Sequence, residues 1–151
     1  MAGTLIVAVR RAVMVGIAGL PEFFEADVMV SEKWPLGESQ AEMAYTVDPT
    51  NFTHEPASLR AGRTFRNEVG RFTVEIRIEG IDKSPEETAD RAIELGTALE
   101  EFIADNRTLF GEVEGLNWIV VEGDGELVEL FNERGSLTAI RYPIKYDARL
   151  T

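Results

Sequence analysis

The stretch that most restricts the fold is residues 70–80, GRFTVEIRIEG, because apolar and polar side chains alternate along its whole length. Successive side chains of a β-strand point to opposite faces of a sheet, so this alternation predicts one buried face and one charged face. A charged second face is typical of an antiparallel sheet that is covered on one side only. The buried face is expected to hold Phe72, Val74, Ile76 and Ile78.

Two helices are predicted to cover the buried face. The first is expected from about Thr4 to Leu20 and is stopped by Pro21, which cannot continue a helix. The second begins after Ser84, which is a suitable N-cap residue, with Pro85 at the first helical position. Glu87 follows the cap by three residues, and this spacing is that of a capping box.

The first helix is apolar on more than one side. Its broad stripe, expected to face the core, consists of Leu5, Val9, Ala12, Val13, Gly16, Ile17 and Leu20. Val7 and Met14 fall on the other side, next to Arg10 and Arg11. Either the two apolar residues are scattered surface hydrophobes, which are common, or all four residues form a subunit interface. Because the arginines lie within the apolar run, a signal peptide or a membrane span is not expected.

The other segments read mostly as strands. Strands near 27–34 and 42–48 precede the long strand, and three strands separated by turn-forming residues follow the second helix as a meander. The segment at about 49–62 contains two prolines and no periodicity, so a long exposed loop is expected there. Together these elements predict a single α+β domain over 1–151. Its mainly antiparallel sheet has two helices packed on one face and ends in a C-terminal β-meander.

The long strand is expected to contain an irregularity. Phe65 and Val69 are apolar at odd positions, whereas the apolar residues from Phe72 onward are even. An alternation cannot shift by one residue without turning its side chains over, so an extra residue is needed. Gly70 is the predicted site of a β-bulge.

Composition excludes several kinds of site. The chain has 27 acidic and 15 basic residues and a formal net charge of −12, so a broad basic surface for nucleic acid is not expected. An acidic surface still suits a conduit through which DNA passes without binding. The absence of cysteine excludes disulfides and thiolate metal sites.

The sequence contains no catalytic pattern. His54 is the only histidine and is expected to be a solvated loop side chain, with a catalytic role as the less favoured alternative. No serine lies in a nucleophile-elbow sequence, and no phosphate-binding glycine pattern is present. Glu122, Asp124 and Glu126 lack the spacing of an EF-hand and fit a charged hairpin turn better than a calcium site. We therefore expect no enzyme, no cofactor and no metal.

Charged residues on the uncovered face of the sheet are candidate partner-binding residues. Their signs are mixed, which favours a specific match with protein subunits over binding to a uniformly negative duplex. The set comprises Arg71, Glu75, Arg77 and Glu79 on the long strand and Arg141, Lys145 and Arg149 on the last strand. The acidic turn at Glu122, Asp124 and Glu126 cannot bury its charges cheaply, so it is expected in solvent, in a lumen or on a rim.

Several segments together resemble the tail terminator proteins of long, non-contractile-tailed bacteriophages and are similar to the versions from actinobacterial phages. The likeness covers nearly the whole chain and is weakest in the predicted loop from Pro49 to Arg60. It rests on LIVAVRRAVMVGIAGL, DVMVSEKWPLGE, LRAGRTFRNEVGRFTVEIRIEG, SPEETADRAIELGTALEEFI and the closing IRYPIKYDARL.

The resemblance implies an assembly protein of the virion, located at the tail and neck and assembled in the host cytoplasm. It implies a hexameric ring of the chain that caps the tail tube protein, offers its other face to a head-completion or neck protein, and lets DNA pass as cargo. One alternative is a head-completion or neck adaptor protein of the same phages. Another is a small host α+β domain that binds a ligand or catalyses hydrolysis, which would need a pocket near His54 or near Tyr142 and Tyr146.

Overall fold

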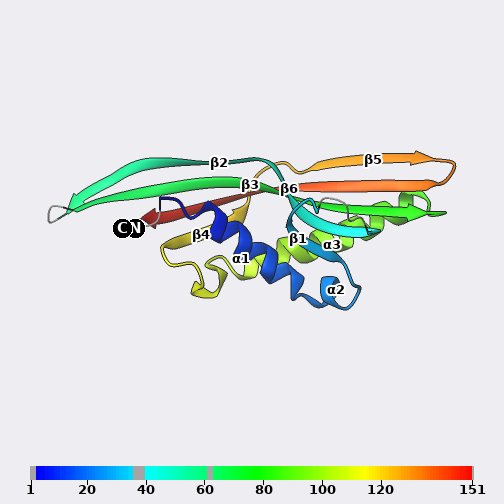
Figure 1. Ribbon diagram of the computed structural model, residues 1–151, viewed down its shortest axis with the longest axis horizontal. Helices are drawn as coiled ribbons and strands as arrows, with labels where there is room; N and C mark the ends of the chain where they lie inside the picture. The colour runs from blue at the N-terminus through cyan, green and yellow to red at the C-terminus, as the bar shows by residue number, and fades with distance from the viewer. Residues whose placement is uncertain (1–2, 36–39, 61–62, 151) are drawn as a thin grey trace.

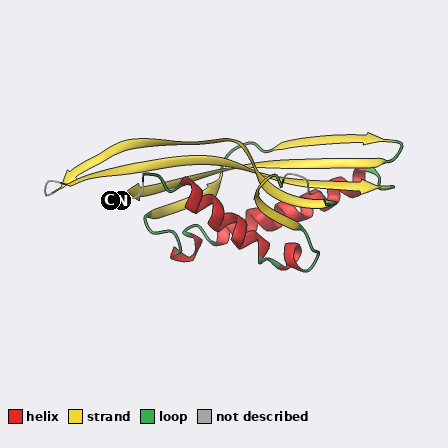
Figure 2. Cartoon of the chain, viewed as in Figure 1, coloured by secondary structure: helices red, strands yellow, loops and turns green. Residues whose placement is uncertain are grey.

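The computed structural model describes residues 3–35, 40–60 and 63–150 and shows the α+β fold that the sequence predicts. A six-stranded, mostly antiparallel sheet runs the length of an elongated molecule (Figure 1). The helices lie on one face of this sheet, as Figure 2 shows in red. The opposite face, called the outer face below, carries no helix in the described part of the chain.

The helices are α1 (Ile6–Ala18), the single turn α2 (Pro21–Phe24) and the long α3 (Pro85–Asp105). A short 3-10 turn at Leu109–Gly111 follows α3. None of the helices within the described residues is both long and apolar enough to cross a bilayer.

The strands are β1 (Met29–Lys33), β2 (Glu42–Arg60), β3 (Arg63–Ile81), β4 (Leu116–Val121), β5 (Glu126–Asn132) and β6 (Gly135–Leu150). The order across the sheet is β1-β2-β3-β6, and β4 and β5 pair with different parts of the remaining edge of β6. Only β1 and β2 are parallel. The predicted C-terminal meander is thus confirmed as β4 to β6.

The core lies between the helices and the even-numbered residues of β3 and β6. Phe72, Val74, Ile76 and Ile78 are all buried there, as the alternation predicts. On β6 the same face presents Ile140, Tyr142, Ile144 and Tyr146. Ala92, Leu95, Leu99 and Ile103 of α3 fill the other side of this layer.

The predicted bulge at Gly70 was wrong. β3 pairs with β6 without interruption from Arg66 to Ile81, so the strand keeps one parity throughout. Gly70 stays on the core side because the ring of Tyr146 occupies its space: a Cβ at residue 70 would lie 2.2 Å from that ring. The irregularities lie in β2 instead, where the register against β3 shifts between Val47 and Asn51 and again between Pro56 and Ser58.

The segment predicted to be an exposed loop at about 49–62 was also assigned wrongly. Its described part is strand, because β2 continues to Arg60 and β3 begins at Arg63, while residues 61 and 62 lie outside the described chain. Figure 1 shows this hairpin extending beyond the helices as a ribbon. Residues Asn51 to Thr53 are exposed on both faces of the ribbon, so no alternation of apolar and polar residues was needed to form it.

The helix start at Ser84 is confirmed as a capping box. The Ser84 hydroxyl accepts a hydrogen bond from the Glu87 amide at 3.2 Å, and the Ser84 amide donates to the Glu87 carboxylate at 2.8 Å. We expect Ser84→Ala to lower the free energy of unfolding by about 1 kcal/mol, because the cap is lost. Ser84→Asp keeps an acceptor and should retain most of the stability in urea denaturation. Equal destabilisation by both variants would contradict this explanation.

Candidate assembly surfaces

The predicted partner-binding residues of the outer face mostly pair with one another or with the acidic turn. Arg71 Nε lies 2.9 Å from Glu122, Arg141 Nε lies 2.8 Å from Glu75, and Arg77 Nη2 lies 3.1 Å from Glu79. Lys145 lies 3.9 Å from Glu122 and 5.8 Å from the centre of the Trp118 ring. Arg149 is exposed at the end of β6. The face therefore presents matched charge pairs, not a field of one sign.

Glu75 differs from the other members of that set because it is buried. Its carboxylate accepts hydrogen bonds from the Tyr45 hydroxyl and from Arg141. Burial, followed by the neighbouring carboxylate, raises the pKa of the Tyr45 hydroxyl. The expectation that Glu75 lies open to a partner was therefore wrong.

Beside Glu75 the outer face holds a cluster that the sequence analysis missed. Trp34 packs edge-on against Tyr45 at 4.9 Å between ring centres, and the Arg77 guanidinium lies 5.1 Å from the centre of the Trp34 ring. Trp34 remains 40% exposed. Tryptophan, tyrosine and arginine are the residue types that dominate the binding energy of protein interfaces, so Arg77 keeps its place as a candidate contact.

The interface predicted on α1 is only partly on the surface. Met14 is 3% exposed and belongs to the core, and Arg10 is buried with its Nη2 2.7 Å from Glu32. Hydrogen bonds from Arg10 hold the pKa of the Glu32 carboxyl below its ordinary value. Because α1 contacts the helices α2 and α3 as well as strands β1, β2 and β3 of the sheet, it is buried on more than one side. Of the four predicted residues, only Val7 and Arg11 are exposed.

The acidic turn lies in solvent, in agreement with its predicted exposure. Glu122 accepts a hydrogen bond from Arg71, which holds the pKa of Glu122 below its ordinary value, while Asp124 and Glu126 are exposed. In the part of the chain that the structure describes, no three acidic or histidine side chains are grouped as a metal site requires.

The most exposed apolar surface is β5, which the sequence analysis treated only as a strand of the meander. All seven of its residues are exposed, including Leu127, Leu130 and Phe131 at 57%, 62% and 75%. The strand pairs with β6 on one side, and no further strand pairs with it among the described residues. An open edge with large apolar side chains is a surface for pairing or packing with another chain.

The β2–β3 hairpin offers a second open edge. β6 flanks β3 as far as Arg66, so only the last three residue pairs, 58–60 with 63–65, are two-stranded. The pairing of β1 with β2 ends at Thr46, and beyond that point β2 has no strand on its other edge among the described residues. An open strand edge is a surface for contact with another chain.

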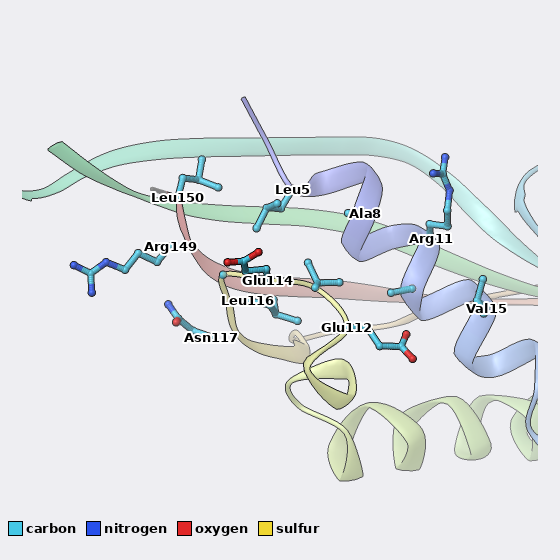
Figure 3. Close-up of a pocket in the computed structure, with 13 residues that line it drawn as sticks. Leu5, Ala8, Arg11, Val15, Glu112, Glu114, Leu116, Asn117, Arg149 and Leu150 are labelled. Carbon is cyan, nitrogen blue, oxygen red and sulfur yellow. The ribbon is translucent and has the colours of Figure 1, made fainter. Parts of the chain in front are cut away.

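An open groove of about 900 Å³ lies between α1 and the segment that leads into β4 (Figure 3). One wall is formed by the α1 residues Ala8, Ala12 and Val15 and by Leu5, the N-cap residue of α1, and Val15 is largely exposed. Leu5 and Ala12, which were expected to face the core, thus also line this groove. The opposite wall includes Val113 and Leu116, and Leu150 closes one end. Arg11, Arg149, Glu112, Glu114 and Asn117 supply the polar lining.

His54 is not a solvated loop residue, so that expectation was wrong. Its Nε2 lies 2.6 Å from Glu68, a fully buried carboxylate that also accepts hydrogen bonds from the Tyr146 hydroxyl at 2.5 Å and the Leu5 amide at 2.8 Å. Burial alone would raise the pKa of Glu68, but these donors outweigh burial and hold it below its ordinary value. Burial, followed by Glu68, raises the pKa of Tyr146.

This buried cluster joins the ribbon, α1 and β6. Tyr142 and Tyr146 are core residues, and neither they nor His54 line the groove. A ligand pocket built on these residues is therefore not supported.

No family model matches the sequence, and no curated protein matches it. The resemblance to phage tail terminators thus stays a prediction.

Proposed function

We propose that the protein is a phage tail terminator, which forms a ring at the end of the tail tube, fixes the tube's length and provides the surface that joins the head. The observation that carries this proposal is that one chain has two open surfaces, the edge of the projecting β2–β3 hairpin and the exposed strand β5 with its large apolar side chains. Both features are poorly suited to an isolated monomer and well suited to a subunit of an assembly.

The resemblance stated above adds to this support, and the charge of the molecule agrees with it. A ring follows when a head-to-tail contact closes on itself, and a conduit for DNA needs an axial hole. With a net charge of −12, the chain would line such a hole without holding the DNA. The matched ion pairs of the outer face suit contact with protein, including the tube protein and the neck protein.

Arg77→Glu tests the outer face. The change replaces a cation above the Trp34 ring with an acid beside Glu79, so we expect loss of contact with the tube and a population of overlong tails. Electron micrographs of tail length and counts of infectious particles, in the phage that encodes the chain, are the measurements. Asp124→Asn is the matched control, because Asp124 is exposed in the acidic turn, and it should leave assembly intact.

Thermal melts of both variants check that the fold is kept. Tails of normal length that fail to join heads would favour the head-completion alternative. No phenotype from Arg77→Glu would mean that this face is only solvated, and the proposal would lose its support there.

A further inference from the structure

We propose that strand β5 of one copy packs into the α1 groove of the next copy, and that this head-to-tail contact builds the ring. The inference deepens the proposed function and rests on it, because it names the two surfaces through which the subunits would meet. The partner at both surfaces is a second copy of this chain.

The donor surface is the exposed strand β5, which has large apolar side chains on both faces. Leu127 and Phe131 point to one face and Leu130 to the other, and all three are more than half exposed. Removing these large apolar side chains from water would favour association.

The acceptor surface is the groove, whose α1 wall has helical spacing. Leu5, Ala8, Ala12 and Val15 recur at intervals of three and four residues, so they form one continuous stripe on the helix. Two of the four are alanines, which let another backbone approach closely. The groove volume of about 900 Å³ is large enough for several leucine or phenylalanine side chains.

The two surfaces lie toward opposite ends of the long axis. In Figure 1, the turn between β5 and β6 is at one end of the sheet, while β4 and the start of α1 lie toward the other. Surfaces that differ and lie at opposite ends make a heterologous contact, which repeats from copy to copy and can close into a ring. The β2–β3 ribbon projects from the groove end, so it would extend alongside the neighbour whose β5 fills the groove.

Charge favours this pairing over contact between two β5 strands. Residues 122–133 contain five acidic and no basic residues: Glu122, Asp124, Glu126, Glu129 and Glu133. Two such segments would repel each other. The groove lining includes Arg11 and Arg149 together with Glu112 and Glu114, so it carries no net charge and repels the acidic strand less than a second β5 would.

Cysteine crosslinking tests the contact directly, because the natural chain has no cysteine. We would prepare Leu130→Cys and Val15→Cys, mix them at high protein concentration, and treat the mixture with a short bis-maleimide. The expected result is a mixed dimer that exceeds the self-crosslinked product of either variant alone. Ile93→Cys is the matched control, since Ile93 is an exposed apolar residue of α3 that belongs to neither surface.

Self-crosslinking of Leu130→Cys above the mixed product would show edge-to-edge pairing and overturn the inference. A mixed product no greater than that with Ile93→Cys would also overturn it.

These outcomes separate the inference from the proposed function. Electron microscopy of the unmodified protein with tail tubes reports the function by itself. If the protein caps tubes but the mixed crosslink is absent, only the contact proposed here is wrong. If the mixed crosslink forms but tubes are never capped, the contact stands and the proposed function fails.

Discussion

Replacing Glu68 with alanine is expected to lower the free energy of unfolding by about 3–5 kcal/mol. The change would leave the Tyr146 hydroxyl and the Leu5 amide without their shared acceptor inside the protein. It would also remove the partner of His54 and so loosen the base of the ribbon. Urea denaturation measures the loss. A loss below about 1 kcal/mol would mean that water replaces the carboxylate at this site.

Glu68→Gln is the matched control for that prediction. The Tyr146 hydroxyl and the Leu5 amide both donate to the same carboxylate oxygen, Oε1, which the amide oxygen of glutamine can replace. The amide nitrogen would then face His54 Nε2, which can accept a hydrogen bond in one neutral tautomer. We therefore expect Glu68→Gln to retain more stability than Glu68→Ala.

The natural chain and the Glu68→Gln variant also give a pH test. Because the pKa of folded Glu68 lies below the ordinary value of 4.5, its charged form contributes stability that is complete above pH 4.5. That contribution is lost as the pH falls through the lower pKa of the folded state. The stability difference between the natural chain and Glu68→Gln should therefore be constant above pH 4.5 and shrink below it. Parallel stability curves down to strongly acid pH would contradict the lowered pKa.

Gly70→Ala is the second change with a large expected effect, a loss of about 3 kcal/mol. The new Cβ would lie 2.2 Å from the Tyr146 ring, which is fully buried and held by its hydrogen bond to Glu68. The ring or the strand must therefore move. Gly19→Ala is the control, because its Cβ would meet nothing closer than 3.7 Å. Equal midpoints for the two variants in urea would show that Tyr146 moves freely.

The Glu68 and Gly70 changes should not be additive. Each change disturbs the packing of the Tyr146 ring, so the double variant should lose less free energy of unfolding than the sum of the two single variants.

Local patterns in the sequence were sufficient where nearby residues alone decide the structure. The alternation from Phe72 to Ile78 needs only a sheet with one covered face, and the capping box at Ser84 is complete within four residues. Both were confirmed. The order of the β4–β6 meander followed from turn residues for the same reason.

Sequence patterns failed where contacts between residues far apart in the chain decide the structure. Glu68 occupies a core position because its donors come from residues 14, 63 and 78 positions away, and none of these contacts leaves a mark near residue 68. Met14 was placed on the surface because a helical stripe was assumed to face one layer, whereas α1 has neighbours on several sides. The ribbon was read as a loop because a strand exposed on both faces shows no alternation.

Of the candidate surfaces, the sequence indicated the outer face and the acidic turn but not the groove or the cluster at Trp34. Both of these depend on elements that meet only in the folded chain. Val15 and Leu116 are separated by most of the sequence, yet they line one groove.

Strand β5 also limits the concentration at which the unassembled protein stays in solution. Short apolar strands with an open edge nucleate aggregates, and Glu126, Glu129 and Glu133 act as gatekeepers by keeping separate copies apart through repulsion. Salt screens this repulsion and acid neutralises it, so solutions of the lone protein should lose colloidal stability under either condition before the fold itself is lost. Conditions that remove this repulsion would therefore set an upper bound on the concentration of unassembled protein.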